Sequence, residues 1–242
     1  MSVLLIPVAP LSRTKSRLRS CFSKDQLKDL TICMFKDLGN TLSKVKFFED
    51  IVVYCNDTEI LELADEFNLT GIKEKLTTPR KSFDEVINDL NLIAMEKFEA
   101  KQTIFTFLDI VLISKKNLQE INSLIKENQL VVCPAIHSAG ISVIGRNPSN
   151  IVETYFSHPN IPSFIAQVNN AKVKGLTKIK IYDSFRAGFD IDIKRDLVLA
   201  YEYLKILDLT TTHTYKFLED NLNLSIRKLN PKNNRKFQFS KI

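Results

Sequence analysis

Short runs of uniformly apolar residues recur along the first half of the chain. They are rich in valine, isoleucine and phenylalanine, which favour strands, and they occupy residues 3–8, 51–54, 104–107 and 131–133. Such a run without alternating polar residues is typical of a strand that is buried on both faces. The pattern therefore predicts four buried strands, and residues 141–144 and 179–182 are candidates for two more.

Between these runs the apolar residues follow a helical period. One face of residues 24–42 carries Leu27, Leu30, Met34 and Leu38. A similar stripe runs through residues 82–100, and Ser82 is a natural N-cap for it. We also expect Asn147-Pro148-Ser149 to open a helix and residues 193–207 to form an amphipathic one.

The alternation of strands and helices predicts an α/β fold. Helices of this length between strands imply crossover connections, and hence a mostly parallel sheet that is covered on both faces. Ligands in such sheets bind beyond the carboxyl ends of the strands. Residues 9–19, residues 56–57 and Asp109 each follow a predicted strand, so we expect them on one rim of the sheet.

Composition sets broad limits on this protein. The 242 residues suit one large domain or a domain with an appendage, and 44% hydrophobic with 26% charged residues argues against wholesale disorder. No apolar run is long enough to cross a bilayer, so we expect a cytoplasmic protein without a membrane partner. The four scattered cysteines indicate neither a zinc site nor a disulfide framework. The net charge of +6 favours anionic partners without identifying one.

A cluster of cations follows the first predicted strand. Residues 9–19 contain Arg13, Lys15, Arg17 and Arg19, and in such a loop cations and backbone amides together suit phosphate oxygens. The sequence has no glycine-rich loop ending in Gly-Lys-Ser/Thr, so it is not a P-loop NTPase. We interpret the cluster as a triphosphate-binding loop, and a solvated basic turn is the alternative.

Three aspartates are candidates for a divalent-metal site. Asp109 directly follows an apolar run, and Asp190 and Asp192 alternate across Ile191, which would point both carboxylates to one side of an extended segment. Mg²⁺ is typically held by one or two carboxylates together with substrate phosphates. If the fold brings these aspartates together, they form a metal site that faces the basic loop. The alternatives are a turn residue for Asp109 and a helix N-cap for Asp192.

Several segments carry motifs in a recognisable order. The chain opens with Pro7-Val8-Ala9-Pro10-Leu11 and continues with Thr14-Lys15-Ser16-Arg17-Leu18. Downstream follow Ser82-Phe83-Asp84 at the opening of a helix, Phe107-Leu108-Asp109 after a strand, and Asp190-Ile191-Asp192. From about residue 3 to residue 207 this order resembles the 2-phospho-L-lactate guanylyltransferase family, whose members have Pro-Val-Lys-Pro-Leu, Ala-Lys-Ser/Thr-Arg-Leu, a metal-binding aspartate after a strand and a closing Asp-Ile-Asp.

This resemblance implies a fold and an activity. The fold is a three-layer α/β sandwich with a mostly parallel mixed sheet, the nucleotidyltransferase fold of the glycosyltransferase-A type. The activity is the transfer of GMP from GTP to 2-phospho-L-lactate, phosphoenolpyruvate or a phosphoglycerate, with release of pyrophosphate, in coenzyme F-420 biosynthesis. Mg²⁺ is the implied cofactor and a homodimer the implied assembly. We assign residues 1–207 to the nucleotidyltransferase domain and residues 208–242 to a helical and basic extension.

The resemblance also implies roles for single residues. The catalytic residues are expected to be Asp109, Lys15 and Arg17, of which the two cations hold the triphosphate. GTP binding is expected of Arg13, Lys15, Arg17 and Asp84. The metal ligands are expected to be Asp109, Asp190 and Asp192, and the acceptor contacts Gly140, Ser142 and Ser163.

Some positions depart from the family's motifs and leave alternatives open. Ala9 replaces the lysine of the first motif, and Pro162-Ser163 and Gln167 replace a Gly-Ser followed by a histidine. A diverged nucleotidyltransferase with another acceptor is one alternative. A non-catalytic nucleotide-binding or nucleic-acid-binding relative is the other, favoured by the tail residues Arg227, Lys228, Lys232, Arg235, Lys236 and Lys241. We expect that tail to be a solvated extension and not a nucleic-acid partner site.

Overall fold

The chain is divided into two compact units. The computed structural model describes residues 1–222, 227–230 and 233–238, with side chains up to residue 222. Unit 1 combines Met1–Pro10 with Leu38–Asp190, and unit 2 combines Leu11–Asp37 with Ile191–Ile242. These units cut across the predicted boundary between residues 207 and 208, because the helices on its two sides both belong to unit 2. The assignment of sequence domains stays a prediction.

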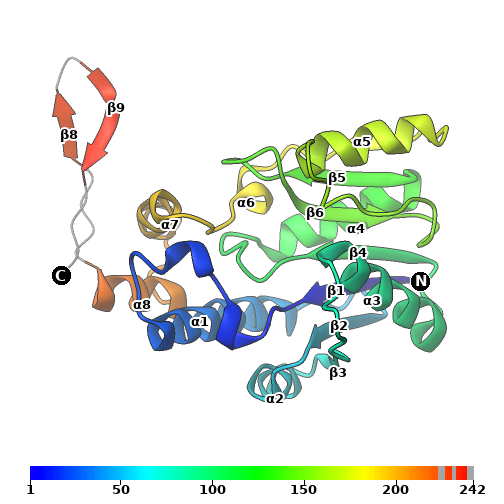
Figure 1. Ribbon diagram of the computed structural model, residues 1–242, viewed down its shortest axis with the longest axis horizontal. Coiled ribbons are helices and arrows are strands. Elements are labelled where there is room, and N and C mark those ends of the chain that lie inside the picture. The colour runs from blue at the N-terminus through cyan, green and yellow to red at the C-terminus, as the bar shows by residue number, and fades with distance from the viewer. Residues whose placement is uncertain (223–226, 231–232, 239–242) are drawn as a thin grey trace. The chain divides into compact units, whose positions relative to one another are not determined.

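Unit 1 contains a seven-stranded sheet with the order β3-β2-β1-β4-β6-β5-β7 (Figure 1). Its strands are β1 Ser2–Pro7, β2 Asp50–Cys55, β3 Thr70–Lys73, β4 Gln102–Thr106, β5 Leu130–Pro134, β6 Ile141–Arg146 and β7 Ile179–Ile181. β6 is antiparallel to both of its neighbours, and the other strands of this sheet run parallel to one another. The predicted mixed, mostly parallel sheet is confirmed, and every predicted strand overlaps an observed one.

The strand order reverses beside β1. The chain proceeds from β1 through β2 to β3, and β4 is then added on the opposite side of β1. Because β1, β2 and β4 are parallel, the segments that follow them begin at one edge of the sheet. A reversal of this kind is where open α/β sheets bind their ligands. Asp109 comes shortly after β4 and therefore lies at the expected edge.

Helices cover both faces of this sheet (Figure 1). α3 and α5 pack on the face that presents Leu5 and Phe105 to the main apolar cluster. On the other face, Gly71 and Gly145 leave room for side chains of α2 and α4. The helices of this unit are α2 Thr58–Glu66, α3 Phe83–Phe98, α4 Lys115–Glu127, α5 Ser163–Val173 and the short α6 Phe185–Gly188. The three-layer α/β sandwich is confirmed.

The prediction that Asn147-Pro148-Ser149 opens a helix is wrong. Residues 147–152 form turns and bends, and α5 begins only at Ser163. The buried Ser149 donates from its hydroxyl to the carbonyl of Ala100 at 2.7 Å and from its amide to the carbonyl of Lys101 at 3.0 Å. Asn91 donates to the carbonyl of Ser149 at 3.2 Å. These partners hold the segment against the start of β4 and satisfy groups that a helix would have used.

Unit 2 is mainly helical. It contains the first part of α1 Lys24–Leu42, α7 Lys194–Ile206 and α8 His213–Asn221, so the helices predicted at 24–42 and 193–207 are confirmed. Asp37 accepts hydrogen bonds from the amides of His213 and Thr214, both at 2.8 Å, and so caps the first turn of α8. The rings of Phe22 and Phe217 pack edge to face at 5.4 Å. These contacts join the two segments of the unit.

The end of the chain contains one described strand pair. β8 Arg227–Asn230 and β9 Asn233–Gln238 are antiparallel. Of the basic tail residues, Lys232 and Lys241 lie outside the described residues. Within the described part of the chain, no helix has the length and apolar character needed to span a membrane.

We expect Ser114→Ala to destabilise the protein by about 1 kcal/mol, because Ser114 caps α4. Its hydroxyl accepts a hydrogen bond from the Asn117 amide at 3.3 Å, and the Asn117 side chain accepts one from the Ser114 amide at 3.0 Å. The measurement is urea unfolding, with Ser123→Ala in the exposed middle of the same helix as the control. Equal effects of the two substitutions would contradict the capping role.

Candidate active site

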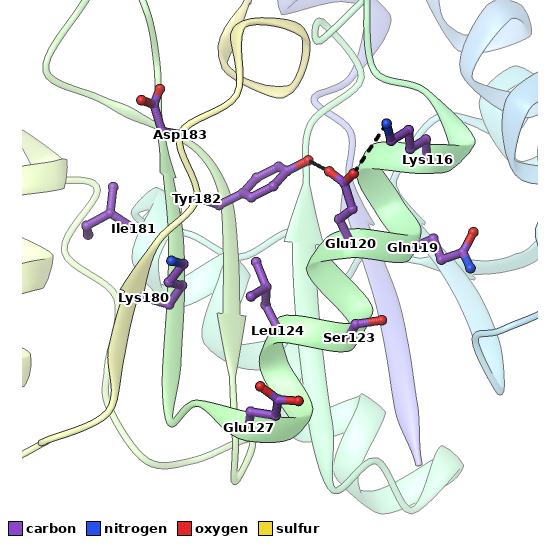
Figure 2. A pocket seen from close by; sticks show the side chains of 10 residues that line it. All are labelled: Lys116, Gln119, Glu120, Ser123, Leu124, Glu127, Lys180, Ile181, Tyr182 and Asp183. Carbon is purple, nitrogen blue, oxygen red and sulfur yellow. Dashed lines mark hydrogen bonds and ion pairs between the residues drawn. The ribbon is translucent and has the colours of Figure 1, made fainter.

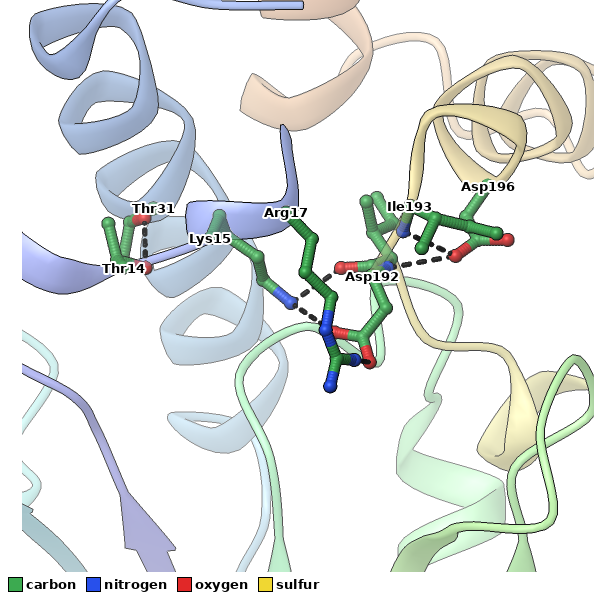
Figure 3. A network of polar contacts seen from close by, with 8 residues as sticks. Thr14, Lys15, Arg17, Thr31, Asp192, Ile193 and Asp196 are labelled. Carbon is green, nitrogen blue, oxygen red and sulfur yellow. Dashed lines mark hydrogen bonds and ion pairs between the residues drawn. The ribbon is translucent and has the colours of Figure 1, made fainter. Parts of the chain in front are cut away.

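Residues 11–19 form a compact cationic loop in unit 2. Two short 3-10 turns, Leu11–Arg13 and Ser16–Leu18, lie on either side of Lys15. The hydroxyls of Thr14 and Thr31 are 2.9 Å apart and anchor the loop on α1 (Figure 3). Lys15 has the left-handed backbone angles φ 46° and ψ 40°, which are unfavourable for a residue with a Cβ. Such strain persists where surrounding contacts enforce it, and it is common at functional sites.

The side chains of this loop contact the start of the second segment of unit 2. Lys15 Nζ donates to the carbonyl of Ile191 at 2.5 Å and lies 3.3 Å from Asp192 Oδ1. Arg17 Nη1 donates to Asp192 Oδ2 at 2.9 Å, so two cations engage the two oxygens of one carboxylate (Figure 3). The Lys15 side chain is 9% exposed, whereas that of Arg17 is 71% exposed. The exposed pair of Arg17 and Asp192 contributes only ~0–1 kcal/mol, so it sets geometry more than stability.

A further carboxylate fixes Asp192 in turn. Asp196 is buried in the first turn of α7, and one of its oxygens accepts hydrogen bonds from the amides of Asp192 at 2.9 Å and Ile193 at 2.8 Å (Figure 3). The N-cap position of α7 is Ile193, so the alternative that Asp192 caps this helix is wrong. Asp196 performs that task, and the Asp192 carboxylate points to Lys15 and Arg17 instead.

The loop carries more positive charge than Asp192 neutralises. Arg13, Arg17 and Arg19 are all exposed, and guanidinium groups bind phosphate oxygens in a bidentate manner. The structure thus brings together Lys15, Arg17 and Asp192, which the sequence had assigned to one site. Lys15 is largely buried against Ile191 and Asp192. Arg17 is therefore the more accessible of the two predicted triphosphate ligands.

The other two candidate metal ligands belong to unit 1. Asp109 lies in a turn after β4, where the amide of Ile110 donates a hydrogen bond to the carbonyl of Phe107 at 3.5 Å. Asp190 follows α6. Arg186 of α6 donates from Nε to the carbonyl of Leu112 at 2.8 Å. This bond joins the segment that follows Asp109 to the helix that precedes Asp190.

Gly188, the last residue of α6, packs against the backbone at the end of β5. Its carbonyl accepts a hydrogen bond from the amide of Ile136 at 2.8 Å, and a Cβ added at Gly188 would come within 2.6 Å of the carbonyl oxygen of Pro134. The backbones approach so closely that only glycine fits. In the described part of the chain, no three or more His, Cys, Asp or Glu side chains form a ready metal cluster.

Asp84, expected to bind GTP, has a structural task in unit 1. Its two carboxylate oxygens accept hydrogen bonds from the amides of Phe156 at 2.8 Å and Ser157 at 2.7 Å. These bonds tether the loop before α5 to the first turn of α3. Asp84 therefore organises the backbone of a neighbouring loop.

The three residues expected to contact the acceptor differ in accessibility. A Cβ at Gly140 would lie 3.9 Å from the Ser163 hydroxyl, so these two residues are neighbours at the start of α5. Ser142 is 1% exposed, and its hydroxyl donates to the carbonyl of Cys133 at 3.1 Å. Gly140 and Ser163 remain candidates for ligand contact, whereas Ser142 is occupied within the sheet.

The positions that depart from the family's motifs also differ. Ala9 is exposed directly after β1. Gln167 is fully buried in α5, and its side chain donates to the carbonyl of Glu153 at 2.9 Å. The glutamine at this position therefore holds the loop before α5 and does not reach a surface ligand.

The cysteines are poor candidates for nucleophiles. All four are free, and Cys55 and Cys133 are buried. Burial raises the pKa of both of these thiols to about 11. They stay protonated at neutral pH, and a thiol is far less nucleophilic than a thiolate.

A pocket of about 760 Å³ lies elsewhere in unit 1, between α4 and the edge strand β7 (Figure 2). It is lined by Lys116, Gln119, Glu120, Ser123, Leu124, Glu127, Lys180, Ile181, Tyr182 and Asp183. Tyr182 donates to the Glu120 carboxylate, and burial raises the pKa of its hydroxyl. The lining contains no residue that the sequence assigned to the active site.

The fold matches that of solved nucleotidyltransferases. A protein from Desulfovibrio desulfuricans assigned to the nucleotide-diphospho-sugar transferases superposes with a TM-score of 0.71 at 15% identity, over 90% of this chain and 94% of that one. A cytidylyltransferase from Leptospira borgpetersenii does so with a TM-score of 0.55 at 15% identity, over 87% and 93%. These similarities establish the class of fold, which is that of the nucleotidyltransferases.

The particular family follows from sequence similarity. Residues 1–239 match the family described as guanylyl transferase CofC like, and the chain belongs to this family. The 2-phospho-L-lactate guanylyltransferase of Methanocaldococcus jannaschii is 31% identical over 195 residues, which cover 80% of this chain and 80% of the relative. The enzyme of the same name from Methanocaldococcus sp. FS406-22 is 30% identical over 80% of this chain and 78% of its own length. The resemblance drawn from the motifs is confirmed.

We expect Asp196→Ala to lower the free energy of unfolding by about 1–2 kcal/mol, because two amides at the start of α7 lose their acceptor. Asp196→Asn should cost less, since one side-chain oxygen accepts both bonds and asparagine retains such an oxygen. Glu202→Ala, within the same helix, is the control, and urea unfolding is the measurement. Similar losses for all three variants would contradict this role.

Proposed function

We propose that the protein transfers GMP from GTP to a small phosphorylated acid, with release of pyrophosphate, in coenzyme F-420 biosynthesis. The candidate acceptors are 2-phospho-L-lactate, phosphoenolpyruvate and a phosphoglycerate. The observation that carries the proposal is the cationic loop of residues 11–19, pinned by Asp192 in a member of the guanylyl transferase CofC like family. Relatives at 30–31% identity that carry the name 2-phospho-L-lactate guanylyltransferase support it.

In this proposal the chain acts mainly by positioning and by charge. Arg13 and Arg17 bind the triphosphate, and Lys15 contributes its charge while it holds the loop on Ile191 and Asp192. An oxygen of the acceptor's phosphate attacks the α-phosphorus, the bond from that phosphorus to the bridging oxygen breaks, and pyrophosphate leaves. The attacking oxygen is already ionised, so no strong base is required and preorganised positive charge supplies most of the catalysis.

The proposed cofactor is Mg²⁺, with Asp109, Asp190 and Asp192 as its ligands. The donor set fits this ion, because Mg²⁺ prefers carboxylate oxygens and needs only one or two from the protein when phosphates and water complete its shell. Bound there, it would neutralise charge on the triphosphate. Asp192 already engages Lys15 and Arg17, so its carboxylate would serve the cations and the ion together.

The acceptor side of the proposal involves fewer residues than the motifs implied. Gly140 and Ser163 are the proposed contacts, since the Ser142 hydroxyl is bound to Cys133. The histidine-to-glutamine departure falls on the buried Gln167, which favours a structural reason for the change over a new acceptor. A cytoplasmic location and a homodimer complete the proposal.

The experiment that tests this function is a pyrophosphate-release assay. The four nucleoside triphosphates are each combined with Mg²⁺ and with 2-phospho-L-lactate, phosphoenolpyruvate or 3-phosphoglycerate. Release that requires GTP, Mg²⁺ and one of these acids supports the proposal. Release with another acceptor only would indicate the diverged transferase, and nucleotide binding without any release would indicate the non-catalytic relative.

We expect Asp109→Asn to lower kcat by ~100-fold or more, since it removes a charge that acts on the reacting phosphates. Asp109 lies in a turn at the edge of the sheet, so the fold should persist, which circular dichroism checks. Asp65→Asn on the exposed side of α2 is the matched control and should retain full activity. Unchanged turnover for Asp109→Asn would remove this residue from the mechanism.

A further inference from the structure

Three phenylalanines from separate segments of unit 1 meet beside the end of β4. Phe107 directly follows β4, Phe83 is the first residue of α3, and Phe156 lies in the loop before α5. Their ring centroids are 5.2 Å apart for Phe83 and Phe156, 5.6 Å for Phe107 and Phe156, and 5.8 Å for Phe83 and Phe107. The rings meet at interplanar angles of 47–87°, an arrangement that aromatic quadrupoles favour.

Phe83 is the outermost ring of this cluster. Phe107 and Phe156 pack against the apolar core, whereas Phe83 is 40% exposed. The start of α3 is fixed independently of this ring, because Ser82 and Glu85 cap the helix with their side chains. A large exposed ring on a packed aromatic base is a surface suited to a planar ligand.

The position of the cluster is that of a ligand site. β1 and β4 are the strands between which the sheet order reverses, and Phe107 precedes Asp109 in the turn that follows β4. α3 begins after β3, so Phe83 lies toward the same carboxyl edge. Open α/β sheets bind nucleotides at this point of reversal.

The cluster is also held in place by hydrogen bonds. Asp84 follows Phe83, and its two carboxylate oxygens fix the amides of Phe156 and Ser157 at 2.8 and 2.7 Å. The backbone at Phe156 is thus tied to the same turn that carries Phe83. A surface that is ordered before the ligand arrives avoids part of the entropic cost of binding.

We propose that the purine base of the nucleotide stacks on Phe83, with Phe107 and Phe156 as supports and Asp84 as a positioning residue. This inference rests on the proposed function and specifies how the donor is held. A purine offers a planar face to an aromatic ring, and such stacking tolerates every base. Phe83 therefore supplies affinity for the nucleoside part, while the choice of guanine requires hydrogen-bonding groups elsewhere.

The chain has no tryptophan, which allows a direct test. The variants Phe83→Trp and Leu92→Trp each introduce one indole on α3, and Leu92 is similarly exposed, at 44%. GTP with Mg²⁺ should quench the emission of F83W, because a purine ring quenches indole fluorescence through direct stacking contact, and it should leave the emission of L92W unchanged. Quenching should saturate at the GTP concentrations at which calorimetry shows binding to the native protein.

A second measurement separates base from phosphates. Phe83→Ala should weaken GTP and ATP binding about tenfold or more, and it should leave the affinity for inorganic tripolyphosphate unchanged. Leu92→Ala should change none of these affinities. Circular dichroism checks that the F83A variant has folded.

The outcomes distinguish this inference from the proposed function. If the native protein binds GTP but F83W responds like L92W, or F83A binds GTP as the native protein does, the stacking role is overturned and the guanylyltransferase proposal stands. If the native protein binds neither GTP nor ATP, the proposed function fails and the inference fails with it.

Discussion

The carboxylate of Asp192 is the interaction on which the candidate active site depends. The loop of residues 11–19 has short 3-10 turns and a left-handed lysine, and neither gives it a rigid shape alone. Asp192 supplies the constraint by engaging Lys15 and Arg17, and Asp196 orients Asp192 through two backbone amides. An anion from the second segment of unit 2 thereby preorganises cations of the first. Without it, like charges so close in sequence would repel one another and spread apart.

The corresponding constraint in unit 1 is the reversal of strand order beside β1. It places the turn that carries Asp109 at the carboxyl edge of the sheet, beside the point where the connections after β1 and β4 lead to opposite sides. The single antiparallel strand of this sheet, β6, then brings β5 and β7 to the far side of β4. α6 and Gly188 return the chain across the end of β5, with backbones so close that a side chain at Gly188 has no room. The position of Asp190, two residues after α6, is set by this packing of α6 against the end of β5.

Sequence patterns predicted the buried strands well, but they could not show which backbone groups the polar side chains bind. The apolar runs and helical stripes were sufficient because they depend on local periodicity, and Ser82 was recognisable as a cap from its own neighbourhood. The short strand β3 was not predicted, because its residues are mostly exposed and form no apolar run. Asp84 and Ser142, for which the resemblance implies ligand contacts, also bind backbone groups elsewhere in the chain. Gln167, a departure from the family's histidine, binds the carbonyl of Glu153. Asp196 and Arg186 went unnoticed, although Asp196 at the third position of a helix is a readable capping signal.

The two kinds of group proposed to hold the nucleotide respond to different physical conditions. Arg13 and Arg17 are exposed, so their proposed attraction to phosphate charge would be screened by added salt over ~8–10 Å. The proposed stacking on the aromatic cluster around Phe83 would instead rest on dispersion and the hydrophobic effect, which moderate salt leaves almost unchanged. Raising the ionic strength should therefore weaken the hold on the triphosphate more than the hold on the base. A nucleoside monophosphate, with fewer charges and the same ring, would lose less of its affinity than GTP does.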